Sequence, residues 1–342
     1  MKSRIKRWLC GTLPLLAAIS AACTPSDKAE YVQVKGLALG TFVYINARTT
    51  HPAAEIARQV ERIDSLAKAS MSIFDDESLL SRVNRNQTDS LDEHIIFNIE
   101  LARRFSELSR GRYDITVKPL VEAWGFVRKQ PDPDSEPNID SLLQFVGYDK
   151  IRIENGRLVK EDPRIQLDFN SIAKGYVVDM MAEMLERDMQ STDYIVDIGG
   201  EVRCKGCNER GERWRIGIET PYDGNDSMED IQRVISITDA GVATSGNYRR
   251  YWTDSEGRKV AHTIDPVTGR SAVSQLLSVT VVAPTCAEAD AAGTMLLAMG
   301  SDGAVELAEQ CDDLLCYFIF AGDGDEEYRV VCSEGLRQML TE

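Results

Sequence analysis

Two kinds of hydrophobic pattern run through the first third of the chain. Apolar and polar residues alternate in residues 31–47, which predicts two β-strands. In residues 52–68 the apolar positions follow a helical spacing behind Thr50, a candidate N-cap; they are Ile56, Val60, Ile63 and Ala67. Residues 89–110 form a second such segment, closed by Gly111. A strand pair followed by two amphipathic helices is therefore predicted.

The remaining chain mixes strand and helix patterns without a repeat. Asn155 and Gly156 separate two short apolar runs in residues 151–160, which favours a hairpin because both residues tolerate positive φ. Strands are predicted at residues 194–198, 214–218 and 277–282, helices at 171–187 and 286–299, and a surface loop around Pro131, Pro133 and Pro137. This irregular alternation predicts an α+β fold, a single domain with mixed, largely antiparallel sheets and packed helices.

The first residues have the layout of an export signal. Four cationic residues precede a stretch of apolar or small residues that runs to Ala22 and is too short to span a membrane. Because small residues lead directly into Cys23, residues 1–22 are predicted to be a lipoprotein signal peptide, with a lipid on Cys23. Residues 23–30 would form a tether and residues 31–342 the catalytic domain. Ordinary cleavage nearby, with Cys23 left free, is the alternative.

Charge narrows the range of partners. The formal net charge of −16 becomes −20 when residues 1–22 are removed, because that segment carries four cationic residues and no acid. So acidic a protein is not expected to bind nucleic acid. A polyphosphate substrate would need local cations or a bound Mg²⁺ to offset repulsion. Six cysteines follow Cys23, and their connectivity cannot be read from the sequence.

Familiar nucleotide and zinc motifs are absent from the sequence. No Gly-x-Gly-x-x-Gly follows a strand, no Gly-Lys-Ser/Thr loop occurs, and three histidines do not make a zinc cluster. Asp290 and Thr294, four apart near a predicted helix start, would share one helix face and could give two oxygens to Mg²⁺. Taken alone, the pair is better explained by a solvated Asp290 and a packed Thr294.

Two further segments contain candidate binding or catalytic residues. At a predicted strand-to-helix step, Asp168 could accept hydrogen bonds from a heterocycle, Ser171 could give an oxygen to a metal, and Lys174 could meet a phosphate. An N-cap with a first-turn lysine is the structural alternative. His262 precedes a Pro-containing turn in which Asp265 has no evident role beyond capping.

In combination, these segments resemble the FAD:protein FMN transferases of the ApbE family. The resemblance runs in order through residues 39–41, 71–74, 113–126, 168–179, 199–200, 243–246, 262–269 and 289–294. It implies an enzyme that takes FAD with Mg²⁺, releases AMP and leaves FMN in phosphoester linkage on a Thr or Ser. The implied acceptors are flavoprotein subunits of membrane electron-transport complexes, such as sodium-pumping or Rnf-type complexes. The family also implies a lipid-anchored protein facing the periplasm.

The resemblance also implies site residues. The positions of the family's metal ligands correspond to Ser171, Asp290 and Thr294. The flavin-nucleotide contacts correspond to Leu39, Ile73, Phe74, Asp75, Arg112, Tyr113, Asp114, Asp168, Lys174 and Ile264, with Phe74 as the stacking ring. His262 is the candidate for positioning or deprotonating the acceptor hydroxyl, a task for a group with a near-neutral pKa.

Several positions depart from the family pattern. The family usually has Met at Leu39, Thr at Ile73 and Gly at Lys118, and Ser171 is often Ala, Gly or Thr. Leu39 keeps an apolar surface, and a ligand that acts through its backbone carbonyl is indifferent to its side chain. Nothing in the sequence explains why Lys118 stands where the family usually has glycine.

Two other functions compete with transfer. Water could replace the acceptor hydroxyl, which would make the protein a Mg²⁺-dependent FAD pyrophosphatase yielding FMN and AMP. A flavin-binding or redox lipoprotein is the alternative from another class, with Cys204 and Cys207 as an active dithiol. This pair lies in a Gly- and charge-rich connection, where a local disulfide or two inert thiols fit the sequence better.

Overall fold

The computed structural model describes residues 28–127, 137–222, 230–248, 250–322 and 327–341. The predicted signal peptide, Cys23, most of the tether, Pro131 and Pro133 lie outside these residues. The helices are α1 (Ala53–Met71), α2 (Leu79–Asn84), α3 (Glu93–Leu108), α4 (Lys118–Ala123), α5 (Ile139–Leu143), the 3₁₀ helix η1 (Tyr148–Lys150), α6 (Ala173–Arg187), α7 (Cys286–Glu309) and α8 (Glu334–Arg337). No described helix is long and apolar enough to cross a bilayer.

The strands gather into one large sheet and three small ones. The large sheet has the order β1-β2-β5-β6-β9-β12-β13-β14, and its neighbours are all antiparallel. Its strands are β1 (Glu30–Ala38), β2 (Thr41–Thr49), β5 (Tyr194–Ile198), β6 (Glu201–Lys205), β9 (Ala240–Gly246), β12 (Leu276–Ala283), β13 (Leu315–Ala321) and β14 (Tyr328–Cys332). The small sheets contain β3 (Ile151–Glu154) with β4 (Arg157–Lys160), β10 (Tyr251–Thr253) with β11 (Lys259–Ala261), and β7 (Trp214–Glu219) with β8 (Ile231–Ile237) and β15 (Leu340–Thr341). The predicted α+β fold is confirmed.

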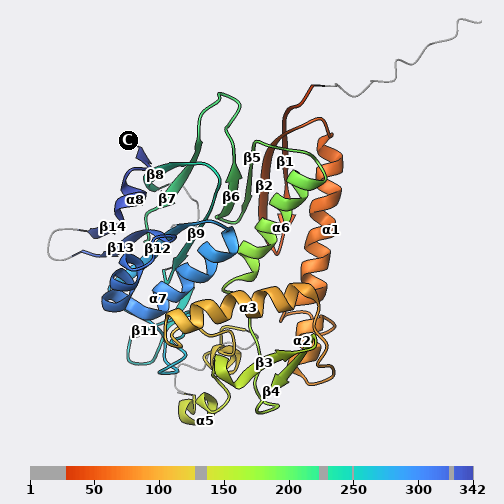
Figure 1. Cartoon of the computed structure of the whole chain (residues 1–342). Coiled ribbons are helices and arrows are strands. Elements are labelled where there is room, and N and C mark those ends of the chain that lie inside the picture. The colour runs from red at the N-terminus through yellow and green to blue at the C-terminus, as the bar shows by residue number, and fades with distance from the viewer. Residues whose placement is uncertain (1–27, 128–136, 223–229, 249, 323–326, 342) are drawn as a thin grey trace, which may run out of the picture.

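Helices cover one face of the large sheet and a small sheet covers part of the other. Helices α1, α6 and α7 lie across the sheet, with α3 crossing below them (Figure 1). The main core fills the space between them and includes fully buried side chains such as Ile45, Phe169 and Phe318. A second core on the opposite face joins the large sheet to β7, β8 and α8. A third, around α4, α5 and β11, lies at the other end of the molecule.

Turn and cap residues account for many element boundaries. Asn155 (φ 51°) and Gly156 (φ 73°) form the predicted turn between β3 and β4. The Asp92 carboxylate caps α3 by accepting from the Ile95 N–H. The prediction of Thr50 as the cap of α1 is wrong, because Pro52 occupies the N-cap position without a side-chain hydrogen bond. Helix α1 therefore begins too late for Thr50 to reach its first turn.

Helix α7 begins as predicted and is longer than predicted. The Thr285 hydroxyl accepts from the Glu288 N–H at 3.2 Å, and it also contacts the Glu288 carboxylate at 3.1 Å. The predicted end at Met299 coincides with a break at Gly300, where φ is 74°. The chain resumes helical geometry and continues to Glu309. The first half of α7 is thus a separate straight segment, and it carries Asp290 and Thr294.

Candidate active site

A cavity lies where α4, the start of α6, the middle of α7 and the segment after β11 meet. It encloses about 700 Å³ of empty space, including its open mouth. Eight predicted site residues line it: Arg112, Tyr113, Asp114, Asp168, Ser171, His262, Ile264 and Thr294. Side chains from such distant parts of the sequence converge here because the third core packs α4 against β11 and Ile264. Its lining, which mixes apolar side chains with a few polar and charged groups, has the character of a pocket for an organic ligand.

Asp168 is a buried carboxylate at the base of the cavity. Its backbone N–H donates to the Ile115 carbonyl at 2.8 Å, and its Oδ1 accepts from the Asn170 N–H at 2.8 Å. Burial raises the pKa of Asp168, while the charges of Lys118 and Arg250 act in the opposite direction. A carboxylate held this firmly can receive an N–H group of a heterocycle without reorganisation.

Tyr113 and Asp114 form the wall beside Asp168. The Ser171 hydroxyl donates to the Tyr113 hydroxyl oxygen at 3.0 Å, and burial raises the pKa of Tyr113, which keeps the phenol neutral. Burial also raises the pKa of Asp114 to about 6, although its Oδ1 accepts from both the N–H and the hydroxyl of Thr116. Next to them Arg112 pairs with Asp265 at 2.8 Å. Asp265 thus ties the cavity wall to the turn that it caps.

Asp290 lies where α6 and α7 come into closest contact. Its Oδ2 accepts from the Gly175 N–H at 3.0 Å, and its side chain is buried, which raises its pKa. A Cβ on Gly175 would lie 2.4 Å from the Cys286 carbonyl oxygen, so only glycine permits this approach. One turn after Asp290, the Thr294 hydroxyl lies 3.5 Å from the Ser245 hydroxyl.

A buried ion pair joins α6 to β6 beside Asp290. The Lys174 ammonium contacts the Glu201 carboxylate, which is itself buried. Burial lowers the pKa of Lys174, but the Glu201 and Asp290 carboxylates outweigh that effect and raise the pKa above its ordinary value. Lys174 therefore stays cationic at neutral pH. It supplies a fixed positive charge at the beginning of α6, where the helix dipole also favours an anion.

His262 presents a neutral imidazole to the cavity. Its Nδ1 lies 3.1 Å from the Arg250 carbonyl oxygen, which can only accept, so Nδ1 carries the proton and Nε2 keeps its lone pair. Burial, together with the Arg250 charge, lowers the pKa of His262 to about 4. The Phe126 ring packs against the imidazole in an edge arrangement, with 6.4 Å between ring centroids. This arrangement leaves Nε2 as a hydrogen-bond acceptor at physiological pH.

The oxygen donors around Asp290 suit a hard divalent cation. One buried carboxylate and the hydroxyls of Thr294 and Ser171 are the ligand types that Mg²⁺ takes alongside substrate phosphates and water. The described residues contain no cluster of three His, Cys, Asp or Glu side chains placed to hold a metal. The donor set therefore fits a Mg²⁺ ion that is shared with a phosphorylated ligand.

Comparison with known proteins identifies the family. Residues 39–318 match the model of the ApbE family. The chain belongs to this family. The FAD:protein FMN transferase of Haemophilus influenzae is 33% identical over 337 residues, covering 93% of this chain and 94% of the relative. That of Vibrio cholerae is 32% identical over 333 residues, covering 95% and 97%.

Solved structures agree with this assignment. The flavin transferase ApbE of Vibrio cholerae superposes with a TM-score of 0.79 at 30% identity, covering 91% of this chain and 99% of that one. The ApbE protein of Thermotoga maritima gives a TM-score of 0.80 at 26% identity, covering 92% and 100%. The ApbE fold thus extends over almost the whole described chain.

Some predicted residues of this ApbE-family chain lie outside the cavity lining. Lys174 and Asp290 lie behind it and connect to it through Glu201, Gly175 and Thr294, as described above. Ile73 is only 3% exposed and packs in the main core. Ile73 is therefore not among the residues that line the cavity, although it was predicted to contact the ligand.

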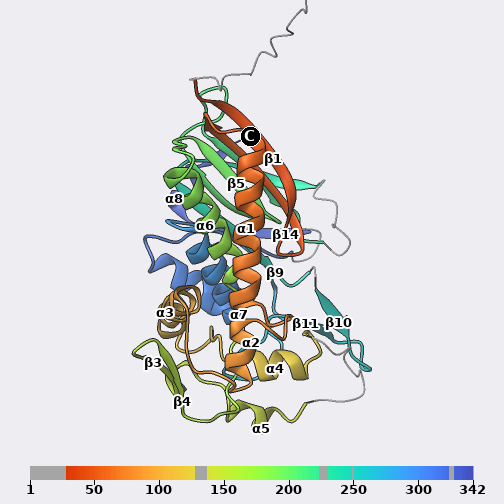
Figure 2. The same ribbon diagram turned by 90° about the vertical axis from the view of Figure 1, so that its right-hand side faces the viewer.

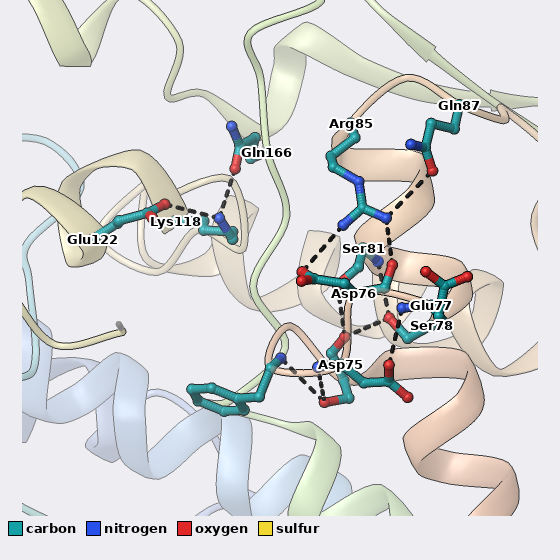
Figure 3. A network of polar contacts seen from close by, with 12 residues as sticks. Asp75, Asp76, Glu77, Ser78, Ser81, Arg85, Gln87, Lys118, Glu122 and Gln166 are labelled. Carbon is teal, nitrogen blue, oxygen red and sulfur yellow. Dashed lines mark hydrogen bonds and ion pairs between the residues drawn. The ribbon is translucent and has the colours of Figure 1, made fainter. Parts of the chain in front are cut away.

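Phe74 and Asp75 lie in a loop after α1. The Phe74 ring is 55% exposed, and the N–H groups of both residues donate to the Ser72 hydroxyl at 3.2 Å. The Ser78 hydroxyl closes the loop by donating to the Ser72 carbonyl at 2.5 Å, and Asp75 accepts from the Glu77 N–H at 2.9 Å (Figure 3). Phe74 is thus an exposed ring on a well-ordered loop.

Lys118, which departs from the family pattern, has a structural explanation. Its ammonium donates to Glu122 Oε2 at 3.0 Å and to Gln166 Oε1 at 2.6 Å (Figure 3). The side chain is buried, so it is a satisfied cation behind the cavity wall. Its charge also acts on Asp168, which gives it an electrostatic link to the site.

Sequence reasoning missed several functional positions. Glu201 was not identified, although it directly follows the Gly199-Gly200 pair that belongs to the resemblance. Asp179 was noted only as the end of a motif, yet its two carboxylate oxygens accept from the Cys286 and Ala287 N–H groups at 3.0 and 2.8 Å. Six other cavity residues lie within the matching segments but were not singled out: Val117, Val121, Phe126, Asn170, Thr263 and Pro266. Arg250 and Ala298 lie outside those segments and carry no sequence signal of their own.

Proposed function

We propose that this chain is a Mg²⁺-dependent FAD:protein FMN transferase. It cleaves FAD, releases AMP and attaches FMN through a phosphoester bond to a Thr or Ser of a target flavoprotein. Membership of the ApbE family supports the flavin transfer, because the curated relatives carry this name. The observation that carries the mechanism is the neutral His262, whose imidazole lines the cavity together with Thr294 and Ser171 and whose Nε2 keeps its lone pair.

The residues that would hold Mg²⁺ are Asp290, Thr294 and Ser171. The bound ion would supply charge stabilisation to the phosphate oxygens during transfer. Lys174 adds a fixed positive charge beside them, held by its pairing with Glu201. Together these groups would bind and orient a diphosphate.

The transfer is an in-line displacement. The oxygen of the acceptor hydroxyl attacks the phosphorus nearer the flavin and forms a new P–O bond, while the bond from that phosphorus to the bridging oxygen breaks. AMP leaves with the bridging oxygen and the electron pair of the broken bond. The proton of the acceptor hydroxyl passes to His262 Nε2, whose lone pair is available because Nδ1 is engaged by the Arg250 carbonyl.

The role of His262 is tested by substitution. We expect His262→Ala to bind FAD with Mg²⁺ nearly as the unchanged chain does and to lose FMN transfer by about a hundredfold or more. FAD binding is measured by quenching of flavin fluorescence, and transfer by fluorescence of FMN on the acceptor protein. His51→Ala is the matched control, since His51 is a surface residue paired with Glu55. Normal transfer by His262→Ala would remove the proposed role.

A pyrophosphatase that uses water in place of the acceptor hydroxyl has the same site requirements. Incubating the protein with FAD and Mg²⁺, with and without an acceptor domain, separates the two reactions. Protein-bound FMN that appears together with AMP supports transfer, and free FMN in both samples supports hydrolysis.

The surroundings of Cys204 and Cys207 do not favour a redox-active dithiol. Cys204 and Cys207 are free thiols, and burial raises the pKa of Cys204 to about 12, which makes it a poor nucleophile. Cys207 Sγ lies 3.4 Å from the Asp193 carboxylate, and neither residue lines the cavity described above.

Export and anchoring belong to the same proposal. Residues 1–22 act as a lipoprotein signal peptide, Cys23 carries the lipid, and the catalytic domain of residues 31–342 faces the periplasm. The support is the charge and hydropathy pattern of the first 23 residues. This placement gives access to flavoprotein subunits of membrane electron-transport complexes as acceptors. Metabolic labelling with a fatty acid, compared between the natural chain and Cys23→Ala, tests the anchor.

A further inference from the structure

Two large apolar side chains are exposed side by side near the tip of the β1–β2 hairpin. Leu37 is 68% exposed and Phe42 is 75% exposed, more than any other large hydrophobic residue that the structure describes. They are directly opposite each other in the antiparallel register, so their side chains lie on the same face. Single exposed apolar residues are common, whereas an adjacent pair forms a continuous apolar surface that a partner can cover. We call Leu37 and Phe42 the hairpin-tip pair.

The hairpin-tip pair is held in place by the surrounding structure. Leu39 (φ 50°) and Gly40 (φ 78°) form a two-residue turn of the kind that matches strand twist. The Leu39 N–H donates to Asp64 Oδ1 on α1 at 2.7 Å, and the Gly199 N–H donates to the Phe42 carbonyl at 3.0 Å. The apolar surface is therefore preformed, which lowers the entropy cost of binding a partner.

The same contacts place the tip of the hairpin beside the Gly199-Gly200 turn, while the Leu37 and Phe42 side chains lie on the sheet face of Tyr44 and the second core, opposite the helices. Gly199 begins the turn that leads into Glu201, and Glu201 holds Lys174 at the beginning of α6. A Cβ on Gly199 would lie 2.8 Å from the Thr41 hydroxyl, so the hairpin tip and this turn are in close contact. The β1–β2 hairpin and the β10–β11 hairpin, which leads into His262, project on the same side of the molecule (Figure 2).

We propose that the hairpin-tip pair is the docking surface for the acceptor protein. It binds an apolar segment beside the hydroxyl residue that receives FMN, and so brings that hydroxyl to the cavity mouth. This rests on the proposed function, because a protein acceptor must contact the enzyme near the transferred phosphate, whereas water needs no such surface. Lys35 lies on the same face, with its ammonium 5.7 Å from the Tyr44 ring centroid, and suits a neutral or acidic neighbour in the bound segment.

The test uses the exported chain with Leu37→Ser, Phe42→Ser and both changes together. The acceptor probe is the purified flavin-carrying domain of a subunit from a sodium-pumping complex. Protein-bound FMN is followed at saturating FAD and Mg²⁺ while the acceptor concentration is varied. We expect the double variant to raise the KM for the acceptor about tenfold. The kcat and the affinity for FAD should stay within about twofold, since neither side chain contacts the cavity.

Val330→Ser is the matched control. Val330 is 40% exposed on β14, at the opposite edge of the same sheet, and we expect its substitution to leave the KM unchanged. Because Leu37 and Phe42 are exposed, serine at these positions should not impair folding, which thermal unfolding checks.

Several outcomes would overturn the proposal. An unchanged acceptor KM in the double variant would do so, as would a loss of FAD affinity, which would make the pair part of the flavin site. A change only in self-association or in vesicle binding would assign the pair to a second copy or to lipid. If the unchanged chain releases AMP and leaves no FMN on the acceptor, the transfer function itself fails and the docking surface fails with it.

Discussion

The contact between α6 and α7 can be tested through a single glycine. In Gly175→Ala the new methyl carbon would lie 2.4 Å from the Cys286 carbonyl oxygen and 2.8 Å from Asp290 Cβ. An ordinary contact needs about 1 Å more, and the Cys286 backbone cannot turn away as a side chain could. The overpacking costs about 3 kcal/mol and the better helix propensity of alanine returns about 1 kcal/mol, so a net loss of about 2 kcal/mol is expected.

The same substitution should also disturb the candidate active site. Moving α7 away from α6 stretches the 3.0 Å hydrogen bond from the Gly175 N–H to Asp290 and displaces the carboxylate that we assign to Mg²⁺. Chemical denaturation measures the free energy of unfolding, and flavin fluorescence measures Mg²⁺-dependent FAD affinity. We expect both to fall in Gly175→Ala.

Gly303→Ala in α7 provides the control. Its Cβ would lie 3.3 Å from the flexible end of Met299, which can move aside. Helix propensity then makes this substitution neutral or stabilising by up to about 1 kcal/mol. Equal stability and equal FAD affinity for Gly175→Ala and the unchanged chain would refute the argument that this close approach positions Asp290.

Three further predictions follow from the site. The pKa of His262 is lowered to about 4, so its imidazole should not titrate between pH 5 and 8 in ¹⁵N-resolved NMR. A titration midpoint near the ordinary pKa of 6.5 would contradict its burial. Because its folded pKa lies below its unfolded one, the stability it contributes is present above pH 6.5 and is lost as the pH falls toward 4. Lys118→Met should weaken FAD binding by roughly threefold to tenfold, because loss of the charge behind Asp168 raises the pKa of that carboxylate. Lys68→Met is the surface control. A dissociation constant for FAD equal to that of the control would argue against this link. Asp179→Ala should lower the free energy of unfolding by about 2 kcal/mol, because two N–H groups at the start of α7 lose their acceptor. Asp179→Asn should lower it less. Equal stability of the two variants in urea titrations would count against capping of α7 by Asp179.

The sequence predicted local structure better than it predicted contacts between segments. Hairpin turns and helix starts depend on nearby residues, and the β3–β4 turn at Asn155-Gly156 was located correctly. The helix end predicted at Met299 is instead a break at Gly300, after which α7 continues to Glu309. The cap of α1 was wrong because Thr50 and Pro52 are both plausible from sequence, and backbone geometry decides between them. The partners of Lys118 could not be foreseen, since Gln166 is 48 positions away and no pattern links the two.

For the site, the ordered motifs located the cavity-lining residues, and the packing of helices decided the rest. Ile73 belongs to a matching segment, but a buried aliphatic residue in a loop gives no sign of which side of the wall it occupies. Glu201 was missed because a carboxylate after a Gly-Gly turn resembles an ordinary surface residue. Only the fold shows that this turn brings it to Lys174.

The pairing of cations around the cavity supports the proposed role of Mg²⁺ in binding a diphosphate. Arg112 is paired with Asp265, Lys118 with Glu122 and Lys174 with Glu201, while Arg250, which also lines the cavity, contacts the Phe126 carbonyl and ring. The carboxylate of Asp290 adds a further negative charge beside Lys174. Without a metal, the diphosphate of FAD would meet a site that is close to neutral in a chain of net charge −16. The affinity for FAD should therefore rise steeply with Mg²⁺ concentration, and Asp290→Asn should flatten that dependence.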